Sequence, residues 1–500
     1  MSEHHPLQEV RRQPRIAIIG GGISGLAAAH EFQRLVPDWD VHLLERSSRL
    51  GGVLRTTRQD GYLIEHAADN FLADPSLPWM LRLCQRLGID DRLVPTDPRF
   101  RRALVVKRGE LHPVPAGFRL MLPTRVWPLL STPLLSLPGK LRMCSEWMVG
   151  RAALDRDESL AEFATRRFGR EAFEWLIEPL IAGIYTADAE RLSVAAALPQ
   201  FVQFERQYGS LTRAAWNQRR LAHARGPESG ARYGAFLGPI DGMSSLIELL
   251  ANALPQERLH LNTSVTSLTR TPDGSSGPRW QLSLSRPTER AANELMEFDG
   301  VLLAASAPAL VPLLGPVDRG LAAELAGIEH ASSAVVCLGY READIRHPLD
   351  AFGLVVPRAE GRRTLSISFS SRKFAGRAPA GEVLLRVFIG GALRADLAEL
   401  DDNQLTQIAL DETTELLGAS GRPRTVLIQR WPKAMPQYHV GHLARLQRIE
   451  ERIKGLSNLQ LTSNAQRGVG MPQCVRDAEQ AAGRIVDAVT AAWESMRQTG

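Results

Sequence analysis

The chain is poor in cysteine and carries no strong excess of charge of either sign. Its four cysteines lie far apart and form no C-x-x-C pair, which excludes a disulfide framework and a structural zinc site, so we expect no bound metal. The 60 basic residues face 55 acidic ones, and the net charge of +5 is too small to indicate nucleic-acid binding. We therefore expect no nucleic-acid partner and a reducing, cytoplasmic location.

Long uninterrupted apolar runs are also missing. Residues 1–13 are polar and lack the apolar core of a secretory signal. Residues 120–141 are rich in Leu, Met and Trp, but Arg125 and a proline at every fifth position interrupt them, which excludes a membrane-spanning helix. We expect short apolar helical turns here that give peripheral membrane contact across residues 110–150 or line an apolar channel. An ordinary buried segment is the alternative.

Against these absences stands one glycine-rich segment, residues 15–25, around which the chain is organised. Four apolar residues, 16–19, predict a buried parallel strand that leads into a tight turn and a helix. Gly20 permits the turn, Gly22 lets the backbone approach a pyrophosphate, and Gly25 lets the helix pack closely on the strand. Because the helix N-terminus offers free N–H groups to phosphate, the segment predicts a dinucleotide site.

The next strand strengthens this prediction. Residues 41–44 form an apolar strand pattern, and Glu45 follows about 20 residues after Gly25, where a carboxylate can hold ribose hydroxyls. A solvated carboxylate at a strand end is the alternative for Glu45. The glycine pair at 51 and 52 resembles the flavin branch of dinucleotide-binding folds, the amine-oxidase-like flavoproteins, so the expected cofactor is FAD.

The remaining pattern predicts an α/β protein with a Rossmann-like FAD-binding domain, a mixed-sheet substrate domain and a helical insertion. Strand patterns between residues 334 and 389 predict the mixed sheet, whereas helical periodicity in 77–87 and 160–180 predicts helices. We expect one alternating strand over residues 259–269 and a final helix over 473–496 whose positive end faces the flavin ring. The expected boundaries are 14–76, 232–305 and 450–496 for the FAD-binding domain, 77–100, 207–231 and 306–449 for the substrate-binding domain, and 101–206 for the helical, membrane-associating cavity domain.

Three further segments carry a family resemblance. Residues 177–188 read Ile-Glu-Pro-Leu-Ile-Ala-Gly-Ile-Tyr-Thr-Ala-Asp, residues 431–438 read Trp-Pro-Lys-Ala-Met-Pro-Gln-Tyr, and residues 468–474 read Gly-Val-Gly-Met-Pro-Gln-Cys. Together they resemble the protoporphyrinogen and coproporphyrinogen oxidases, in which the first segment lines the porphyrinogen cavity and the other two lie near the flavin. The likeness extends over about residues 15 to 490 and so covers nearly the whole chain.

The resemblance implies a set of FAD contacts, which we carry over position by position. They comprise the glycine turn, the end of the second strand with the glycine pair, a turn before residue 71, and contacts from later elements. The implied residues are Gly20, Gly21, Gly22, Ile23, Ser24, Gly25, Glu45, Arg46, Gly52, Val53, Ala67, Ala68, Asp69, Asn70, Val265, Trp431, Val469, Gly470 and Met471.

The resemblance also implies substrate contacts. Arg102 stands where protoporphyrinogen oxidases keep an arginine for a propionate, and a guanidinium can bind a carboxylate through two hydrogen bonds. Gly183 matches a glycine whose backbone lies beside the substrate. Phe388, Val355 and Phe369 match apolar residues that sandwich the macrocycle. The alternatives are a solvated basic pair for Arg102 and ordinary core packing for the aromatic residues.

The implied reaction is the oxidation of protoporphyrinogen IX to protoporphyrin IX in late haem biosynthesis. Three hydride transfers to the flavin remove six electrons, and dioxygen reoxidises the flavin with release of hydrogen peroxide. No residue stands out as an acid or base, so none is assigned as catalytic. Arg102 and the absence of basic residues in 72–76 favour protoporphyrinogen over the nearest alternative, coproporphyrinogen III.

Two more distant alternatives remain. One is another flavin amine oxidase or a desaturase, and the other is a non-catalytic FAD-binding scaffold. The expected small-molecule partners are the porphyrinogen and dioxygen. A ferrochelatase is an expected protein partner by pathway logic, because free porphyrins are phototoxic.

Overall fold

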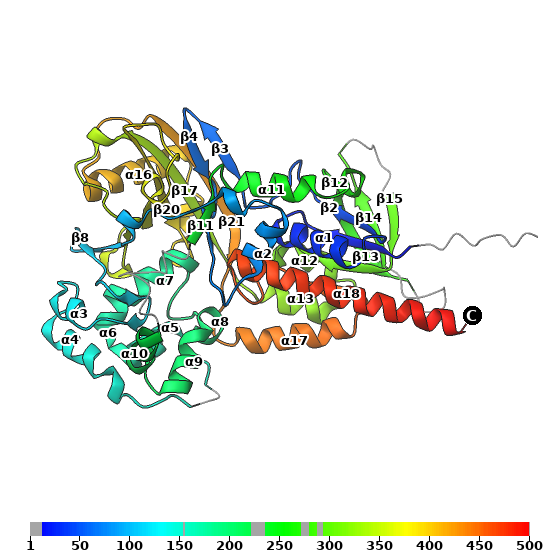
Figure 1. The fold of residues 1–500 in the computed structure, drawn as a ribbon, viewed down its shortest axis with the longest axis horizontal. Coiled ribbons are helices and arrows are strands. Elements are labelled where there is room, and N and C mark those ends of the chain that lie inside the picture. Colours follow the sequence, from blue (N-terminus) through cyan, green and yellow to red (C-terminus); the bar gives the residue numbers. More distant parts are fainter. Residues whose placement is uncertain (1–12, 154–155, 222–235, 272–279, 288–293, 500) are drawn as a thin grey trace, which may run out of the picture.

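A five-stranded parallel sheet forms the base of the fold. The computed structural model describes residues 13–153, 156–221, 236–271, 280–287 and 294–499. The sheet has the order β12-β2-β1-β16-β22 (Figure 1). Its strands are β1 (Arg15–Ile19), β2 (Asp40–Leu44), β12 (Leu259–His260), β16 (Gly300–Leu303) and β22 (Leu459–Leu461). Ile16 and Ile18 pack into the core on one side of the sheet, and Ala17 and Ile19 pack into the core on the other. This alternation buries β1 on both faces, which explains its continuous apolar sequence.

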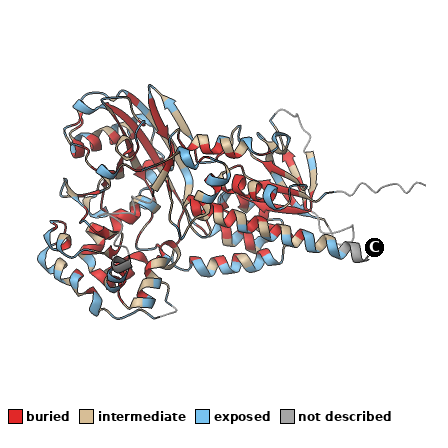
Figure 2. Ribbon diagram, viewed as in Figure 1, coloured by how far each residue is buried: buried red, intermediate tan, exposed pale blue. Residues whose placement is uncertain are grey.

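Different elements cover the two faces of this sheet. One face carries α1 (Ile23–Leu35), α2 (Trp79–Arg86), α11 (Met243–Asn252) and α18 (Met471–Thr499). The other face carries the antiparallel strands β13 (Ser264–Arg270), β14 (Trp280–Ser285) and β15 (Glu294–Phe298), and the helices α12 (Ala307–Leu314), α13 (Arg319–Ala326) and α17 (His442–Lys454). Figure 2 shows the buried residues concentrated along the sheet and the inward sides of its helices. The parallel sheet is thus the middle layer of three.

A second, mixed sheet of seven strands stands beside the first, with the order β21-β17-β20-β19-β18-β7-β8. Its strands are β7 (Leu104–Lys107), β8 (Glu110–Pro113), β17 (His330–Arg341), β18 (Gly353–Val355), β19 (Thr364–Phe369), β20 (Glu382–Gly390) and β21 (Thr425–Pro436). The helix α16 (Asp402–Leu417) covers its outer face, where Leu405, Ile408 and Ala409 join the core. The hairpin of β3 (Thr56–Gln59) and β4 (Tyr62–Glu65) packs on the opposite face. That opposite face, which we call the inner face, therefore looks toward the first sheet.

Helices make up the third region, which Figure 1 shows below the mixed sheet. They are α3 (Trp127–Ser131), α4 (Leu137–Cys144), α5 (Leu160–Phe168), α6 (Arg170–Ala172), a π-helical turn (Phe173–Ile177), α7 (Glu178–Tyr185), α8 (Val194–Ala197), α9 (Pro199–Tyr208) and α10 (Leu211–Leu221). Arg167 is completely buried here and bridges Glu146 and Glu205, which ties the segment around α4 to α9. Within the ranges given above, no helix is long and apolar enough to cross a bilayer.

Short elements complete the described part of the chain. The remaining strands are β5 (Phe71–Leu72), β6 (Leu93–Pro95), β9 (Phe118–Arg119), β10 (Leu122–Pro123) and β11 (Phe236–Pro239), and the remaining α-helical turns are α14 (Ser370–Lys373) and α15 (Ala395–Ala398). The 3-10 turns comprise Asp90–Arg92, Pro98–Phe100, Ser145–Met148, Gln256–Arg258, Glu342–Asp344 and Arg358–Glu360.

The structure departs from the sequence-based expectations in two respects. The single strand expected over residues 259–269 is two strands, β12 and β13, because Asn262 adopts a positive φ of 52° between them. The expected domain boundaries also differ from the packing. The helix α2 packs in the core of the parallel sheet, as do α12, α13 and α17, whereas β7 and β8 belong to the mixed sheet rather than to the helical region.

Candidate functional site

The turn between β1 and α1 forms a cradle built from Gly20, Gly21 and Gly22, which contribute no side chains to it. Gly20 has a φ of 113°, and a Cβ on Gly25 would overlap the carbonyl oxygen of Gly20. A Cβ on Gly22, by contrast, would meet no atom within 4 Å. Gly22 precedes α1, no side chain caps that helix, and its first turn, which begins with Ile23 and Ser24, contains no acidic residue. The cradle therefore leaves room and N–H donors for a phosphate, which fits a bound dinucleotide.

Glu45 lies beside this cradle at the end of β2. Its carboxylate accepts hydrogen bonds from the N–H of Gly21 at 2.7 Å and from the N–H of Ser47 at 2.8 Å. The N–H of Gly51 donates to the carbonyl oxygen of Gly21 at 2.8 Å, so the loop that carries Gly52 and the exposed Val53 closes onto the turn. Arg46 is exposed next to Glu45. The sequence-predicted residues for the nucleotide end of FAD thus lie together.

The remaining residues expected to contact FAD come from elements far apart in the chain. The indole N–H of Trp431 on β21 donates to the carbonyl oxygen of His66 at 3.0 Å, which sets it beside the turn of residues 67–70. Val265 packs with the core that includes Ile19 and Leu44, at the carboxyl ends of β1 and β2. Met471 begins α18, and Val469, just before it, packs against the helical region. Gly470 lies between them, so this turn joins the first region to the third.

The inner face of the mixed sheet carries a row of cross-strand neighbours. In this row Val355 pairs with Ser366, Ser366 with Phe388, Phe388 with Val335, and Val335 with Gln429. A Cβ on Gly183 of α7 would lie 3.4 Å from the side chain of Val355, so α7 approaches this row closely. Gly183, Val355 and Phe388 are therefore brought to one surface that also faces the turn of residues 67–70.

Two sequence-predicted substrate residues lie elsewhere. Phe369 is 0% exposed and packs in the core under α16, because an odd number of positions separates it from Ser366 along β19 and turns it to the outer face. The structure therefore places Phe369 on the opposite face of the sheet from Val355 and Phe388.

The guanidinium of Arg102 is half-exposed and forms an ion pair with Asp350, and its Nε donates to the carbonyl oxygen of Asp350 at 2.6 Å. In this structure Arg102 is engaged by a carboxylate of the chain itself.

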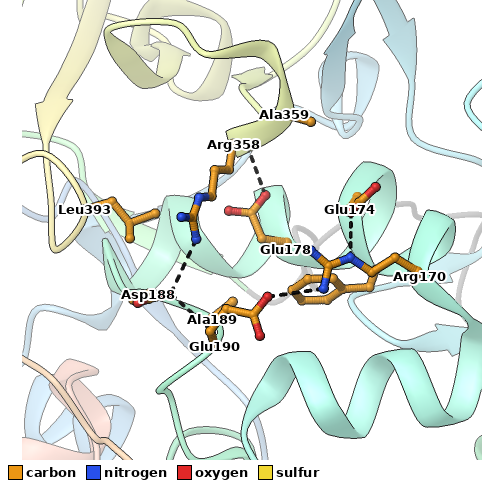
Figure 3. A pocket seen from close by; sticks show the side chains of 10 residues that line it. Arg170, Glu174, Glu178, Asp188, Ala189, Glu190, Arg358, Ala359 and Leu393 are labelled. Carbon is orange, nitrogen blue, oxygen red and sulfur yellow. Dashed lines mark hydrogen bonds and ion pairs between the residues drawn. The ribbon is translucent and has the colours of Figure 1, made fainter.

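A cavity of about 480 Å³ opens beside the N-terminal end of α7 (Figure 3). The Glu178 carboxylate points into it and accepts a hydrogen bond from the N–H of Arg358 at 3.3 Å. Arg358 lies 3.9 Å from Asp188, and Arg170 pairs with Glu174 and Glu190 across the opening. Burial raises the pKa of Glu178 to about 7, the neighbouring Asp188 and Glu174 act in the same direction, and Arg358 opposes them. Glu178 thus changes protonation near neutral pH.

Two ionisable residues were not predicted as site residues from the sequence: Glu178, at the cavity beside α7, and Arg386, on the inner face of the mixed sheet. Arg386 lies on β20 and faces the same side as Phe388, with its guanidinium 5.2 Å from the centre of that ring. The sequence feature that could have indicated both residues is a single charged residue inside an apolar segment. Glu178 interrupts Leu176 to Ile181, and Arg386 interrupts Val383 to Ile389. A buried charge in such a setting needs a partner, and that partner is rarely visible in the sequence.

Comparison with known proteins agrees with this geometry. The family profile described as flavin containing amine oxidoreductase matches residues 23–486. The coproporphyrinogen III oxidase of Bacillus subtilis (strain 168) is 31% identical over 487 residues, which cover 95% of this chain and 98% of that protein. The mitochondrial protoporphyrinogen oxidase of Nicotiana tabacum is 26% identical over 492 residues, which cover 94% of each chain.

A solved structure extends the comparison to three dimensions. The crystal structure of an Exiguobacterium sp. 255-15 protein, provisionally named a protoporphyrinogen oxidase, superposes with a TM-score of 0.81 at 30% sequence identity and covers 95% of this chain and 99% of that one. The glycine cradle and Glu45 are suited to hold the nucleotide part of FAD. FAD is the cofactor. The chain belongs to the flavin-containing amine oxidoreductase family.

Proposed function

We propose that this chain oxidises coproporphyrinogen III to coproporphyrin III, with dioxygen as the final electron acceptor and hydrogen peroxide as the second product. The observation that carries the proposal is the surface that brings together Gly183, Val355 and Phe388, close to the turn beside Trp431. A glycine at the wall leaves room for a broad macrocycle. The bound FAD supplies hydride acceptance, and this chain supplies orientation and a dry surface.

The residues have distinct roles in this proposal. Val355 and Phe388 contact the macrocycle through its faces, and Gly183 admits its edge along α7. Trp431 and the turn of residues 67–70 hold the opposite wall in position. Each of three rounds removes a hydride from a saturated bridging carbon and a proton from a pyrrole nitrogen, so that six hydrogens leave the substrate and three molecules of dioxygen take them up.

Two observations favour coproporphyrinogen III over the protoporphyrinogen IX that the sequence alone suggests. Three relatives named coproporphyrinogen III oxidase are 29–32% identical over nearly the whole chain, whereas five plant relatives named protoporphyrinogen oxidase are 26–29% identical. In addition, the sequence argument for protoporphyrinogen depends mainly on Arg102 as a propionate ligand. Because the guanidinium of Arg102 already pairs with Asp350, that argument is weaker. Protoporphyrinogen IX is the second candidate because residues 72–76 contain no basic side chain.

The test is anaerobic bleaching of the flavin absorbance by each porphyrinogen, followed by fluorescence of the product. Faster bleaching with coproporphyrinogen III than with protoporphyrinogen IX supports the proposal. The reverse order moves the assignment to protoporphyrinogen IX. A yellow protein that neither compound bleaches contradicts both, and leaves a non-catalytic flavoprotein.

We also propose that the helical region contacts a lipid surface. Large apolar side chains are exposed along α3, α4 and the turn that follows, with Trp127 at 77% and Leu137 at 70%. The other exposed members of this apolar edge are Val126, Leu130, Leu141, Trp147 and Met148. Figures 1 and 2 show α3 and α4 at one extremity of the molecule, away from the parallel sheet. Clustered exposed tryptophan and leucine side chains suit shallow insertion into one leaflet.

A further inference from the structure

A buried cluster of charges joins the inner face of the mixed sheet to the turn of residues 67–70. Arg386 is 2% exposed, and its guanidinium donates to the carbonyl oxygen of Ala67 and lies 3.5 Å from the Asp69 carboxylate. The Lys373 ammonium lies 3.3 Å from the same carboxylate. Arg377, also buried, lies 3.9 Å from Glu65. Five ionisable groups, from β4, the turn that follows it, α14, the loop after α14 and β20, thus lie close together.

The charges of this cluster do not balance. Among the residues that the structure describes, the cluster contains the cations Lys373, Arg377 and Arg386 and the carboxylates Glu65 and Asp69. Burial raises the pKa of Glu65, whereas the pKa of Asp69, which burial alone would raise, is held low by Lys373 and Arg386. The cluster therefore has an excess of positive charge. Since an uncompensated buried charge is costly, an anion that enters from outside would be stabilised here.

Unpaired polar atoms mark the point where such an anion would bind. The Nε of Arg386, the Oγ of Ser368 and the Oγ of Ser370 are buried and have no hydrogen-bond partner in the described part of the chain. Ser368 stands directly opposite Arg386 in the pairing of β19 with β20, so both side chains lie on the inner face about 5 Å apart. The neighbouring row of this face carries Val355 and Phe388.

We propose that Arg386 and Ser368 form a carboxylate subsite that receives one propionate of the porphyrinogen, an inference that rests on the function proposed above. A guanidinium N–H and a hydroxyl are both donors to a carboxylate, and the substrate carboxylate would offset the excess positive charge. Coproporphyrinogen III carries a propionate on each of its four pyrrole rings, so any ring that faces β19 and β20 brings a carboxylate. Protoporphyrinogen IX carries propionates on only two rings. The subsite therefore discriminates in favour of the tetracarboxylate.

The experiment compares the binding of coproporphyrin III with that of its tetramethyl ester to the FAD-loaded enzyme, measured by quenching of porphyrin fluorescence. Ser368→Ala and Arg386→Gln are expected to reduce the preference for the acid over the ester by about tenfold, because each removes a hydrogen bond to a charged group. Arg372→Gln is the matched control, since this neighbouring cation pairs with Glu342 instead and its loss leaves the preference unchanged. Bound FAD, read from the absorbance, identifies any variant that fails to assemble.

The outcomes separate the subsite from the proposed reaction. If both variants weaken binding of the acid and of the ester equally, the two residues only support the fold and the subsite is overturned. Ser368→Ala is the decisive variant if Arg386→Gln does not retain FAD, because the serine makes no hydrogen bond that the fold would lose. Selective loss of acid binding in a protein that oxidises neither porphyrinogen would support the subsite and contradict the proposed reaction.

Discussion

The phenolic oxygen of Tyr438 accepts a hydrogen bond from the backbone N–H of Gly468 at 3.0 Å, and its hydroxyl donates to the carbonyl oxygen of Asn464. The ring is buried and stacks on His442 at 4.3 Å between ring centres. Tyr438 follows β21, which carries Trp431, whereas Gly468 begins the turn that leads into α18. One buried side chain therefore holds two segments expected to contact the flavin in a fixed relation.

Tyr438→Phe should weaken both the fold and FAD binding. The substitution leaves the partly buried Gly468 N–H and Asn464 carbonyl without their partner, which costs about 1–3 kcal/mol. Urea unfolding of the loaded enzyme and titration of the apoprotein with FAD measure the two effects. Tyr208→Phe is the control, because this ring packs beside Phe204 in the helical region and should change stability by less than about 0.5 kcal/mol. Equal effects of the two substitutions would contradict the positioning role.

Gly22→Ala should fold normally and lose FAD. An added Cβ meets no protein atom within 4 Å, so the apoprotein has no reason to be destabilised by a clash. The same methyl group would occupy the place where a phosphate approaches the backbone, so we expect FAD affinity to fall at least about tenfold. Gly25→Ala is the contrasting variant, since its Cβ would overlap the Gly20 carbonyl and should prevent folding. Retention of FAD by Gly22→Ala would mean that the pyrophosphate lies elsewhere.

Local patterns were enough to predict the nucleotide-binding part of the fold. β1, α1 and β2 follow from an apolar run, glycine spacing and a second apolar run, all within about 30 residues. The break at Asn262 was not predictable from alternation alone, because the residues on both sides of it fit a strand. The packing of α2 against the core of the parallel sheet was not predictable either. An amphipathic sequence shows that a helix has a buried side, but not which element covers that side.

The substrate side was harder to predict because its arrangement depends on contacts between distant residues. The alternation of β19 separates Phe369 from Ser366, yet nothing in the sequence tells which face is turned toward the parallel sheet. Arg102 finds Asp350, a residue 248 positions away. The raised pKa of Glu178 likewise arises first from its burial by tertiary packing and then from the neighbouring Asp188 carboxylate, against the opposing effect of Arg358. Motifs identified the family, whereas tertiary packing determined which side chains are available.

Glu178→Gln should make the protein more stable at alkaline pH. The folded state raises the pKa of Glu178 from 4.5 to about 7, so between these values the unfolded state has lost a proton that the folded state still holds. The free energy of unfolding of the wild type therefore falls as the pH rises from 4.5 to 7, by up to about 3 kcal/mol. Because glutamine stays neutral at every pH, the free energy of unfolding of the Glu178→Gln variant should not fall in this way.

The measurement is urea unfolding of both proteins at pH 5 and pH 8. We expect similar stability at pH 5, where Glu178 is protonated in the fold, and a more stable variant at pH 8. Glu174→Gln lines the same cavity on the side of Arg170 and is the control, with an effect below about 1 kcal/mol at both values because its ion pair is largely solvated. A difference between wild type and Glu178→Gln that is the same at both pH values would contradict the raised pKa.

Asp350→Ala should improve substrate binding if Arg102 is a propionate ligand. The ion pair with Asp350 competes for the guanidinium, and both side chains are half-exposed, so the pair is worth about 0.2–1 kcal/mol. Releasing Arg102 should then lower KM up to about fivefold, whereas Arg102→Ala should raise it. In the double variant the benefit of Asp350→Ala should vanish. Additive effects of the two substitutions would instead show that Asp350 and the substrate do not compete for Arg102.

Replacing apolar side chains on α3 and α4 should release the enzyme from membranes. Trp127→Ser with Leu137→Ser removes two side chains exposed by 77% and 70% at one extremity of the molecule. Because burial of such a side chain contributes about 1.5–3 kcal/mol, flotation with vesicles of anionic and zwitterionic phospholipid should report at least a tenfold loss of bound protein. Leu295→Ser is the matched control, since Leu295 is 59% exposed on β15 at the opposite end and its loss should leave flotation unchanged. If the double variant floats as the wild type does, the apolar edge of α3 and α4 is not the lipid contact.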